Sequence, residues 1–298
     1  MSNIILQVEN LSFTYPNRRQ ALDDISFQIE KGEKVFFHGS NGAGKTTLFQ
    51  CINGLLKIKQ GIVRFNGRIV KSERERMKLI SIVFQNAEDQ IIAGSVFDEV
   101  AFGPINHGLP KEEVVQRAEH ALRIMNIEYL RNYPPHFLSY GEKKRVTIAS
   151  VLSMEQEMII LDEPTAGLDG HQKEELVEIL DNLANEGHTL LISTHESDFS
   201  LRCADRIIVL EQGKLLAEGK AEELFSRNDI LEKASLVKPI IMEVYEKLQE
   251  YSYIESDHLP KDIKELSILL HQKFIASKTD SMFFGEPDSI SATKQRLE

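Results

Sequence analysis

A short glycine-rich segment carries the residue types that hold nucleotide phosphates. It consists of nine consecutive residues: Gly39, Ser40, Asn41, Gly42, Ala43, Gly44, Lys45, Thr46 and Thr47. The glycines let the backbone turn tightly around an anion with its N–H groups pointing inward. Lys45 can reach the β- and γ-phosphates, and the Thr46 hydroxyl can bind Mg²⁺. The segment therefore predicts a nucleotide-binding loop, for which an ordinary glycine turn is the structural alternative.

Two adjacent carboxylates follow an apolar run much later in the chain. Residues 158–161 are apolar, and Asp162 and Glu163 come directly after them. Because neighbouring side chains on a strand point to opposite faces, the two acids should have different roles. Asp162 could hold Mg²⁺ beside Thr46, and Glu163 could act on the water that attacks the γ-phosphate. The alternative is a plain helix cap, since Asp commonly takes that position.

A further polar cluster surrounds Ser139 and Gly141. Glu142 follows Ser139 by three residues, which is the spacing of a capping box and explains these two residues structurally. The same helix end would expose N–H groups beside Gly141 and carry partial positive charge, so it could also bind phosphate. A helix of about a dozen residues, roughly 18 Å long, then leads away from it. We therefore expect this tip to lie apart from its own phosphate loop.

These groups need a scaffold of alternating strands and helices. Apolar or alternating runs predict strands at 4–8, 25–29, 34–38, 80–84, 158–162 and 189–193, with hairpins at 61–70 and 206–218. Helices are predicted after Thr47, from Pro110 onward and across 171–186. Such alternation predicts an α/β fold in which the binding loops lie at the carboxyl ends of parallel strands.

The pattern changes beyond about residue 230. Apolar residues at helical spacing predict two amphipathic helices, one from Leu236 to Leu248 and one from Ile263 to Phe274, before a polar and loose tail. We therefore expect a nucleotide-binding domain at 1–228, with a helical subdomain at about 86–155, and a C-terminal helical extension at 229–298.

Composition excludes several classes of protein. With 298 residues, 42% of them hydrophobic and 27% charged, the chain is typical of globular proteins. Neither an apolar run of about 18 residues nor a secretory signal is present, so no transmembrane segment is expected. A net charge of −11 argues against nucleic acid as a partner. Two cysteines are too few for a disulfide framework and favour the cytoplasm.

The order of these motifs resembles that of an ATP-binding cassette (ABC) ATPase over residues 4–225. The matching segments are 39–47, Gln85, 138–145, 161–164, 168–169 and 193–195. The resemblance implies a P-loop NTPase core with a mixed or parallel sheet, an antiparallel β subdomain and an α-helical signature subdomain. It also implies hydrolysis of ATP, with Mg²⁺, between two subunits arranged head to tail, either identical or paralogous.

The resemblance further implies roles for single residues. Tyr15 is similar to the aromatic residue that stacks on adenine, with a core tyrosine as the structural alternative. Gln85 resembles the glutamine that senses Mg²⁺, the attacking water and the membrane partner. His195 resembles the histidine that contacts the γ-phosphate. Asp169 resembles the aspartate that couples the two sites of the dimer.

The signature segment departs from the usual pattern. Tyr140 and Glu142 stand where the family usually has Gly and Gln. Ser139 and Gly141 are retained, so the resemblance implies a competent signature that binds the partner subunit's nucleotide.

Residues 86–106 indicate a narrower group. Asn86 to Gln90, followed by Phe97 to Pro104 and Asn106, is similar to the ATPases of energy-coupling-factor transporters, although Ala87 and Glu88 replace the usual Pro and Asp. In that group this segment receives a helix of a membrane-embedded coupling subunit. Gly103-Pro104 should break the backbone there.

Membership of that group would make the chain a peripheral protein on the cytoplasmic face of the cell membrane. It would drive uptake of cobalt, nickel or a vitamin, which a separate substrate-binding membrane subunit selects. The helical extension would hold two ATPase subunits together, or alternatively pack on its own domain. Another ABC transporter, or a soluble ABC ATPase without a transport role, remains an alternative.

Overall fold

The chain forms two compact units, which we describe from a computed structural model of residues 3–254, 256 and 258–283. The units are Met1–Lys238 and Pro239–Glu298. The division lies ten residues after the expected boundary at 228, because the short helix α9 (Asn228–Ala234) packs against two strands of the first unit. The loose tail that we expected falls on 284–298, outside the described residues.

One sheet of the first unit is antiparallel, with strand order β2-β1-β4-β5. Its strands are β1 (Ile4–Thr14), β2 (Gln20–Glu30), β4 (Gln60–Phe65) and β5 (Arg68–Ile69). The first two are longer than the apolar runs that predicted them, because β1 and β2 pair along eleven residues each and include polar positions. Asn66 and Gly67 both have positive φ, as the predicted tight hairpin turn requires.

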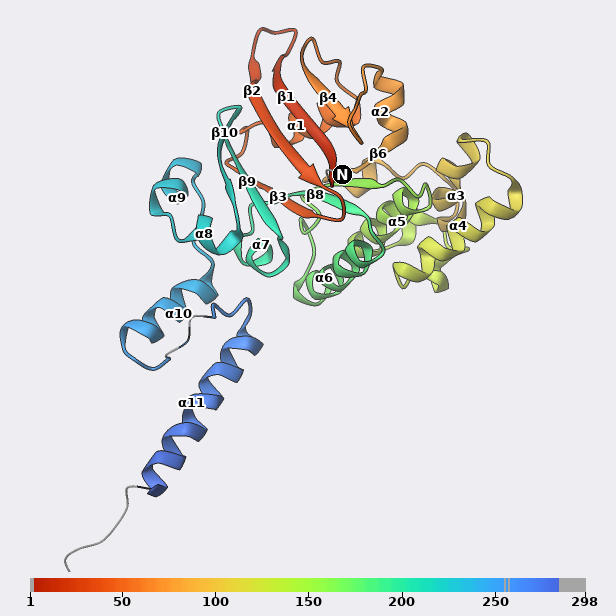
Figure 1. Ribbon diagram of the computed structural model, residues 1–298. Helices are drawn as coiled ribbons and strands as arrows, with labels where there is room; N and C mark the ends of the chain where they lie inside the picture. Colours follow the sequence, from red (N-terminus) through yellow and green to blue (C-terminus); the bar gives the residue numbers. More distant parts are fainter. Residues whose placement is uncertain (1–2, 255, 257, 284–298) are drawn as a thin grey trace, which may run out of the picture. The chain divides into compact units, whose positions relative to one another are not determined.

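The second sheet has six strands in the order β10-β9-β3-β8-β7-β6 (Figure 1). They are β3 (Lys34–His38), β6 (Ile80–Val83), β7 (Met158–Asp162), β8 (Thr189–Ser193), β9 (Arg206–Glu211) and β10 (Lys214–Gly219). All pairs are parallel except β9 with β10. The carboxyl ends of β3, β7 and β8 therefore meet at one edge, as expected.

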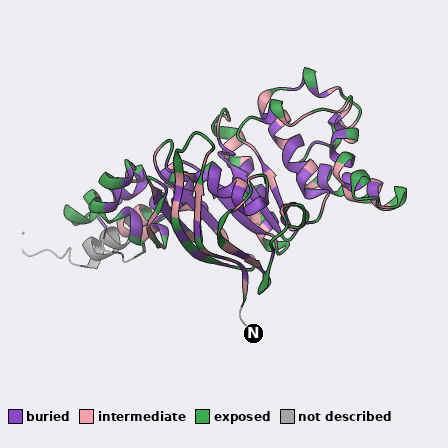
Figure 2. Ribbon diagram, turned by 90° about the horizontal axis from the view of Figure 1, so that it is seen from above, coloured by how far each residue is buried: buried purple, intermediate pink, exposed green. Residues whose placement is uncertain are grey.

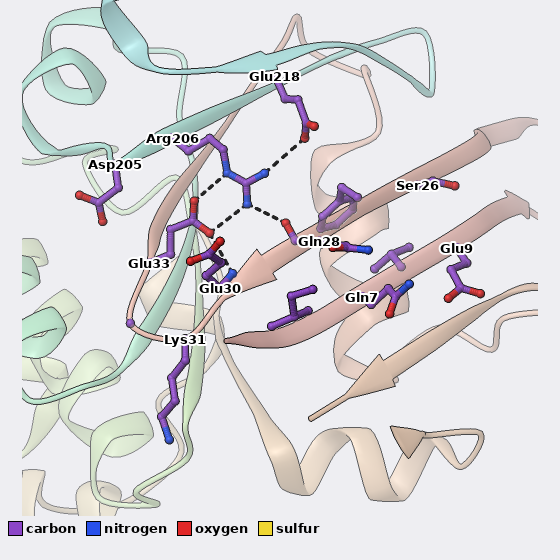
Figure 3. Close-up of a pocket in the computed structure, with 14 residues that line it drawn as sticks. Gln7, Glu9, Ser26, Gln28, Glu30, Lys31, Glu33, Asp205, Arg206 and Glu218 are labelled. Carbon is purple, nitrogen blue, oxygen red and sulfur yellow. Dashed lines mark hydrogen bonds and ion pairs between the residues drawn. The ribbon is translucent and has the colours of Figure 1, made fainter. Parts of the chain in front are cut away.

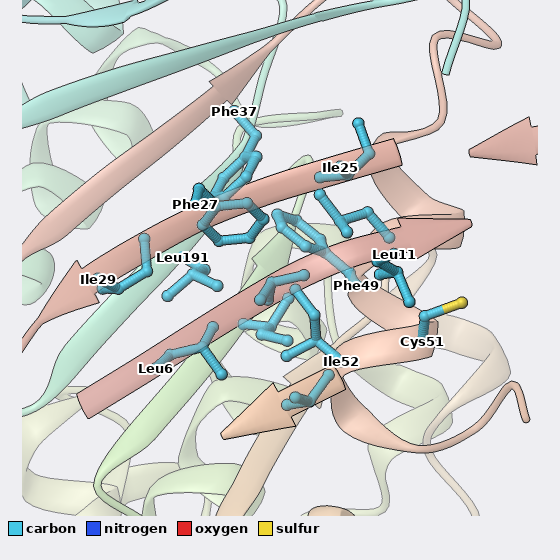
Figure 4. Packing of buried hydrophobic residues seen from close by; sticks show 14 of the residues in the cluster. Leu6, Leu11, Ile25, Phe27, Ile29, Phe37, Phe49, Cys51, Ile52 and Leu191 are labelled. Carbon is cyan, nitrogen blue, oxygen red and sulfur yellow. The ribbon is translucent and has the colours of Figure 1, made fainter. Parts of the chain in front are cut away.

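Apolar residues of both sheets enclose helix α1 (Lys45–Asn53). Phe37 of β3 packs edge-on against Phe27 of β2 and Phe49 of α1, at centroid distances of 5.6 and 5.1 Å (Figure 4). Its neighbour Phe36 points to the other face and meets Phe199 at 5.4 Å. Because side chains alternate along β3, this one strand contributes to the apolar core on both faces of the sheet.

Helices cover the remaining surfaces of the sheets. They are α2 (Glu73–Leu79), α6 (Gly170–Asn185), α7 (Ser197–Cys203) and α8 (Ala221–Phe225), with short 3₁₀ turns at Ala87–Asp89, Glu128–Leu130 and Pro135–Phe137. Cys51 in α1 and Cys203 in α7 are both buried, and burial raises the pKa of each thiol to about 12.

The helical region consists of α3 (Val96–Asn106), α4 (Lys111–Ile124) and α5 (Tyr140–Leu152), which pack on one another. Buried residues follow their inner faces (Figure 2). The expected break at Gly103-Pro104 is wrong, since α3 continues to Asn106. Pro104 has no N–H for the Val100 carbonyl four residues earlier, and the Ser153 hydroxyl donates to that oxygen instead, at 2.7 Å.

The second unit contains α10 (Ile240–Glu250) and α11 (Ile263–Phe283). The first of these helices begins after Pro239, so Leu236 and Val237 precede it, contrary to the prediction. The Tyr245 hydroxyl donates to the Ser256 carbonyl, which ties the loop after α10 back to that helix. In the described part of the chain, no helix has the length and apolar character needed to cross a bilayer.

Candidate active site

A cavity of about 870 Å³ lies at the sheet edge where β3, β7 and β8 end. Most of the predicted site residues line it. Its lining comprises Tyr15, Asn17, Arg19, Ala21, Gly39, Ser40, Asn41, Gly42, Ala43, Gly44, Lys45, Thr46, Thr47, Gln85, Asp162, Glu163, His195, Ser235, Leu236 and Val237.

The phosphate loop has a backbone that only glycine allows at two points. Gly39 has φ +145°, and a Cβ there would lie 2.2 Å from the Leu210 carbonyl oxygen. Gly44 has φ +110°, and a Cβ there would lie 2.8 Å from the Ala21 carbonyl oxygen. Helix α1 begins directly after Gly44, so its free N–H groups face the loop. The loop is therefore shaped to receive an anion at a helix N-terminus.

Lys45 supplies a buried positive charge at this loop. Its Nζ donates to the Gly39 carbonyl at 2.6 Å. Burial lowers the pKa of Lys45, and the nearby carboxylates of Glu163 and Asp162 oppose that shift. The nearby carboxylates thus favour the charged form of Lys45, whose ammonium group lies at the loop and can bind phosphate oxygens there.

Asp162, at the end of β7, faces the first turn of α1. Its Oδ2 accepts a hydrogen bond from Thr46 Oγ1 at 2.7 Å, and its Oδ1 accepts one from the Ser193 hydroxyl. Hydroxyl and carboxylate oxygens suit Mg²⁺, which commonly takes its remaining ligands from phosphates and water. Among the described residues, no three His, Cys, Asp or Glu side chains gather into a metal-binding group. Thr46 and Asp162 nevertheless place two oxygen ligands of the kind that Mg²⁺ prefers side by side.

Glu163 stands just past the strand in a strained backbone conformation. Its φ of +49° is unusual for a residue other than glycine. The Glu163 N–H donates to Ser193 Oγ at 2.8 Å and lies 3.2 Å from the Ser193 carbonyl oxygen, so the end of β8 fixes it. Its carboxylate is 10% exposed and pairs with His195 Nδ1 at 3.0 Å. A carboxylate oriented by an imidazole at the cavity wall can act as a general base.

Tyr15 lies at the rim of the same cavity. Its hydroxyl is 3.0 Å from Thr47 Oγ1, and its ring packs edge-on against Phe13 at a centroid distance of 5.0 Å. The side chain is half-buried, so it is not a core tyrosine.

Three predicted residues do not line the cavity. Ser139 caps α5 and forms the expected capping box with Glu142. Asp169 caps α6 in a second capping box, with Gln172. Gly141 follows Ser139 in the first turn of α5. The signature tip thus lies outside its own nucleotide cavity, as the sequence predicted.

Sequence reasoning missed three features near the site. Ser193 holds both Asp162 and the backbone of Glu163. Lys144 is 1% exposed and donates to the Gln85 carbonyl at 2.6 Å. It lies on the buried face of α5 with Thr147 and Ile148, three and four positions later. In the sequence, its charged neighbours give no sign of this burial. Leu236 and Val237 reach the cavity from a distant segment, and no local pattern indicates that.

A second cavity, of about 850 Å³, lies away from this chemistry. Arg206 dominates it and binds both carboxylate oxygens of Glu33, at 2.6 and 2.9 Å, as well as the Gln28 carbonyl at 2.6 Å (Figure 3). Glu218 lies 3.4 Å from the same guanidinium. These bonds connect β9 and β10 with β2, so the arrangement is structural.

Comparisons with known proteins agree with this geometry. The model of the family described as ABC transporter matches residues 22–166. The energy-coupling factor transporter ATP-binding protein EcfA of Carboxydothermus hydrogenoformans is 42% identical over 275 residues, which are 92% of this chain and 99% of the relative.

Solved structures give the same result. The protein cbiO1 from Clostridium perfringens, part of the ABC transporter complex cbiONQ, is 36% identical with a TM-score of 0.72, over 84% of this chain and all of that one. The ATP-binding cassette MJ0796, seen as a dimer bound to ADP and Pi, is 28% identical with a TM-score of 0.66, over 73% of this chain and 99% of that one. The chain therefore belongs to the ABC transporter family, and within it to the ATPase subunits of energy-coupling-factor transporters.

Proposed function

We propose that this subunit hydrolyses Mg²⁺-bound ATP at an interface with a second ATPase subunit, and that this drives uptake of cobalt, nickel or a vitamin. The observation that carries the proposal is the pair of Glu163 and His195, 3.0 Å apart, in the cavity that also holds Lys45 and Asp162. In this proposal, Glu163 would be the base, Lys45 the cation that binds phosphate and Asp162 the carboxylate that binds the metal ion.

Binding of the nucleotide would use several of the residues that line the cavity. Lys45 and the N–H groups of the phosphate loop would hold the β- and γ-phosphates, while Tyr15 would stack on adenine. Thr46 and Asp162 would hold Mg²⁺, which when bound offsets the charge on the phosphate oxygens.

Hydrolysis would then depend on Glu163. Its carboxylate would take a proton from water as the water oxygen attacks the γ-phosphorus and the bond to the ADP oxygen breaks. His195 would orient that carboxylate and contact the γ-phosphate, and the Gln85 side chain, at the cavity rim, would position water and Mg²⁺.

The second subunit would complete the site. Ser139 and Gly141 lie outside their own cavity, which supports their use on the nucleotide of a partner subunit. Asp169 caps a neighbouring helix and would couple the two sites. The relative MJ0796 is a dimer with ADP and Pi. A homodimer and a heterodimer with a paralogous ATPase both fit this arrangement.

The membrane partner would bind the segment that follows Gln85. Ile92, Phe102 and Ile105 are 68%, 45% and 58% exposed, and such apolar side chains mark interaction sites when they gather. A membrane-embedded coupling subunit at the cytoplasmic face of the cell membrane would cover them. A substrate-binding membrane subunit would select the cargo.

Glu163→Gln tests the proposed reaction directly. The amide cannot accept the proton, so turnover should fall by roughly 10²–10⁴-fold while ATP binding is kept. Steady-state hydrolysis and calorimetric titration with ATP measure the two quantities. Glu178→Gln, at an exposed position of α6, is the matched control and should behave as wild type. Undiminished turnover in Glu163→Gln would remove Glu163 from this role.

A further inference from the structure

The first turn of α5 contacts the main chain at Gln85. The Tyr140 hydroxyl donates to the Gln85 carbonyl oxygen at 3.1 Å, and Lys144 Nζ donates to the same oxygen at 2.6 Å. Tyr140 and Lys144 are four residues apart and so lie on one face of the helix. Together they use both lone pairs of that carbonyl. The helix that starts at the signature tip is thereby bonded to the rim of the nucleotide cavity.

The ring of Tyr140 makes a second contact, with Gly167. A Cβ at Gly167 would lie 2.7 Å from Tyr140 Cε1, so the ring occupies space that only glycine leaves. Gly167 also has φ +77°, which favours glycine on its own account. Gly167 stands two residues before Asp169 in the same loop. One side chain therefore touches both the Gln85 segment and the loop that leads to Asp169.

Two lysines of α5, Lys143 and Lys144, also bond to the segment around Gln85. They differ from Tyr140 in the strength of these bonds or in the segments that they connect. Lys143 pairs with Glu88 at 2.6 Å, but the Glu88 side chain is 57% exposed, and solvent weakens such pairs. Lys144 is buried, and burial lowers its pKa to about 8, so it stays largely charged at pH 7 and strengthens its bond to Gln85. The Lys144 ammonium group donates to the carbonyls of Gln85 and Phe84, which belong to one segment. Tyr140 adds the connection to Gly167.

We propose that Tyr140 is a positioning residue that fixes the main chain at Gln85 and the loop at Gly167 relative to the tip at Ser139 and Gly141. The tip offered to a second subunit and the rim of this subunit's own cavity then move as one body. This inference rests on the proposed function, because it gives the tip its role at a partner's nucleotide. Glycine, usual at this position of the signature, has no side chain to make either contact.

Hydrogen exchange of the full-length chain tests the link without relying on activity. Tyr140→Phe keeps the ring and removes the hydroxyl, so amide exchange in residues 85–90 should become about two- to tenfold faster, the change expected for one hydrogen bond. Tyr140→Ala also removes the ring, so residues 165–169 should become faster as well. The melting temperature should stay close to that of wild type in Tyr140→Phe.

The matched control is Tyr129→Phe. It removes a hydroxyl that donates to Glu142 Oε1 at 3.3 Å, close to the same tip but without a bond to Gln85. Exchange in residues 85–90 should be unchanged in this variant. Wild-type exchange at 85–90 and 165–169 in both Tyr140 variants would overturn the proposal, and so would equal acceleration in Tyr129→Phe.

Turnover and nucleotide affinity separate positioning from a general structural effect. In Tyr140→Phe, turnover at saturating ATP should fall about two- to tenfold, and further in Tyr140→Ala. The affinity of each variant for ADP should stay within about twofold of wild type, because Tyr140 does not line its own cavity. A parallel loss of ADP affinity and melting temperature in Tyr140→Phe would contradict positioning. Absence of ATP turnover in the wild type would instead refute the proposed function, while the exchange result would still decide the contact.

Discussion

His38, one residue before the phosphate loop, is a fully buried titratable group beside the site. Its Nε2 shares a hydrogen bond of 2.5 Å with Ser200 Oγ, and its ring stands edge-on to Phe225. Burial first, then the charges of Lys45 and His195, lowers the pKa of His38 from 6.5 to about 3. The folded chain therefore holds this imidazole neutral in mildly acidic solution.

This shift predicts a loss of stability on acidification. Below pH 6.5 the unfolded chain binds a proton at His38 that the folded chain does not, so the free energy of unfolding should decrease as the pH falls from 6.5 toward 3. At pH 5 the loss from this one group is about 2 kcal/mol. Denaturant unfolding between pH 7 and pH 5 measures it.

His38→Gln removes the titration and should flatten this pH dependence. His171→Gln removes an imidazole whose side chain is 84% exposed and should leave the dependence as in wild type. Identical slopes for wild type and His38→Gln would contradict a buried neutral His38.

At the residue scale, the sequence predicted which residues meet in one cavity wherever the motif has a fixed spacing. The phosphate loop, Asp162 and Glu163 could be identified because phosphate and Mg²⁺ chemistry uses those residue types at the ends of buried strands. His195 was identified only through the family resemblance. The role of Lys144 could not be predicted, because a lysine between two other basic residues is typical of a solvent-exposed helix face. Burial of its ammonium depends on a carbonyl 59 residues away, which no local pattern encodes.

At the scale of elements, α3 depends on the hydroxyl of Ser153, the residue that follows the end of α5. Ser153→Ala removes the donor to the Val100 carbonyl that Pro104 cannot serve, and both Ser153 and Val100 are buried. The loss should destabilise the protein by about 1–3 kcal/mol, the cost of a buried carbonyl without its partner. Thermal unfolding monitored by circular dichroism measures the change.

Ser150→Ala is the matched control on the same helix. The Ser150 hydroxyl donates to the Thr147 carbonyl, which lies inside α5 and has a main-chain partner in the helix. This variant should stay within about 0.5 kcal/mol of wild type. Equal losses of stability in the two variants would show that the Ser153 hydroxyl does not compensate for the hydrogen bond that Pro104 cannot make.

The exposed face of α3 leads to a prediction about the membrane partner. Phe102→Ser should leave folding intact but weaken association with the coupling subunit by about tenfold, because aromatic anchors contribute heavily to interfaces. Leu55→Ser changes a side chain of matching exposure, 46% against 45%, elsewhere on the chain. Retention of the membrane subunit during detergent purification compares the two. Equal retention would place the interface elsewhere.

Element type was predictable from periodicity, but element ends were predictable only for some short strands. Strands 34–38, 158–162 and 189–193 were predicted with the bounds the structure has, because they are short and buried on both faces. The helix through Pro104 could not be predicted, since its missing hydrogen bond is replaced by a residue about fifty positions later.

At the scale of the whole molecule, the second unit has exposed apolar side chains. Ile240, Val244, Ile263 and Ile268 are exposed in it. We expect truncation after Lys238 to weaken pairing of the ATPase subunits in the absence of ATP, because the loss of such side chains removes apolar contact area. Sedimentation at matched concentrations measures the dimer fraction. A truncated chain that dimerises as well as the full chain would assign the second unit to another task.

The overall architecture follows from alternation of strands and helices, but the division into units does not. Helix α9 belongs with the first unit because Ile230, Leu231 and Ala234 are buried and the helix lies on β9 and β10. From the sequence alone, α9 could equally be assigned to the C-terminal helical extension.

We expect the two thiols of this chain to react poorly with alkylating reagents in the native state. Cys51 is fully covered, Cys203 is 3% exposed, and both stay protonated at neutral pH, so neither offers the thiolate that maleimides attack. A cysteine introduced by Ser139→Cys would therefore carry a dye or a cross-linker alone, with no background to remove. The protein is therefore suited to site-directed labelling at this position. In a dimer, the distance between the labels on the two subunits could be followed through a catalytic cycle.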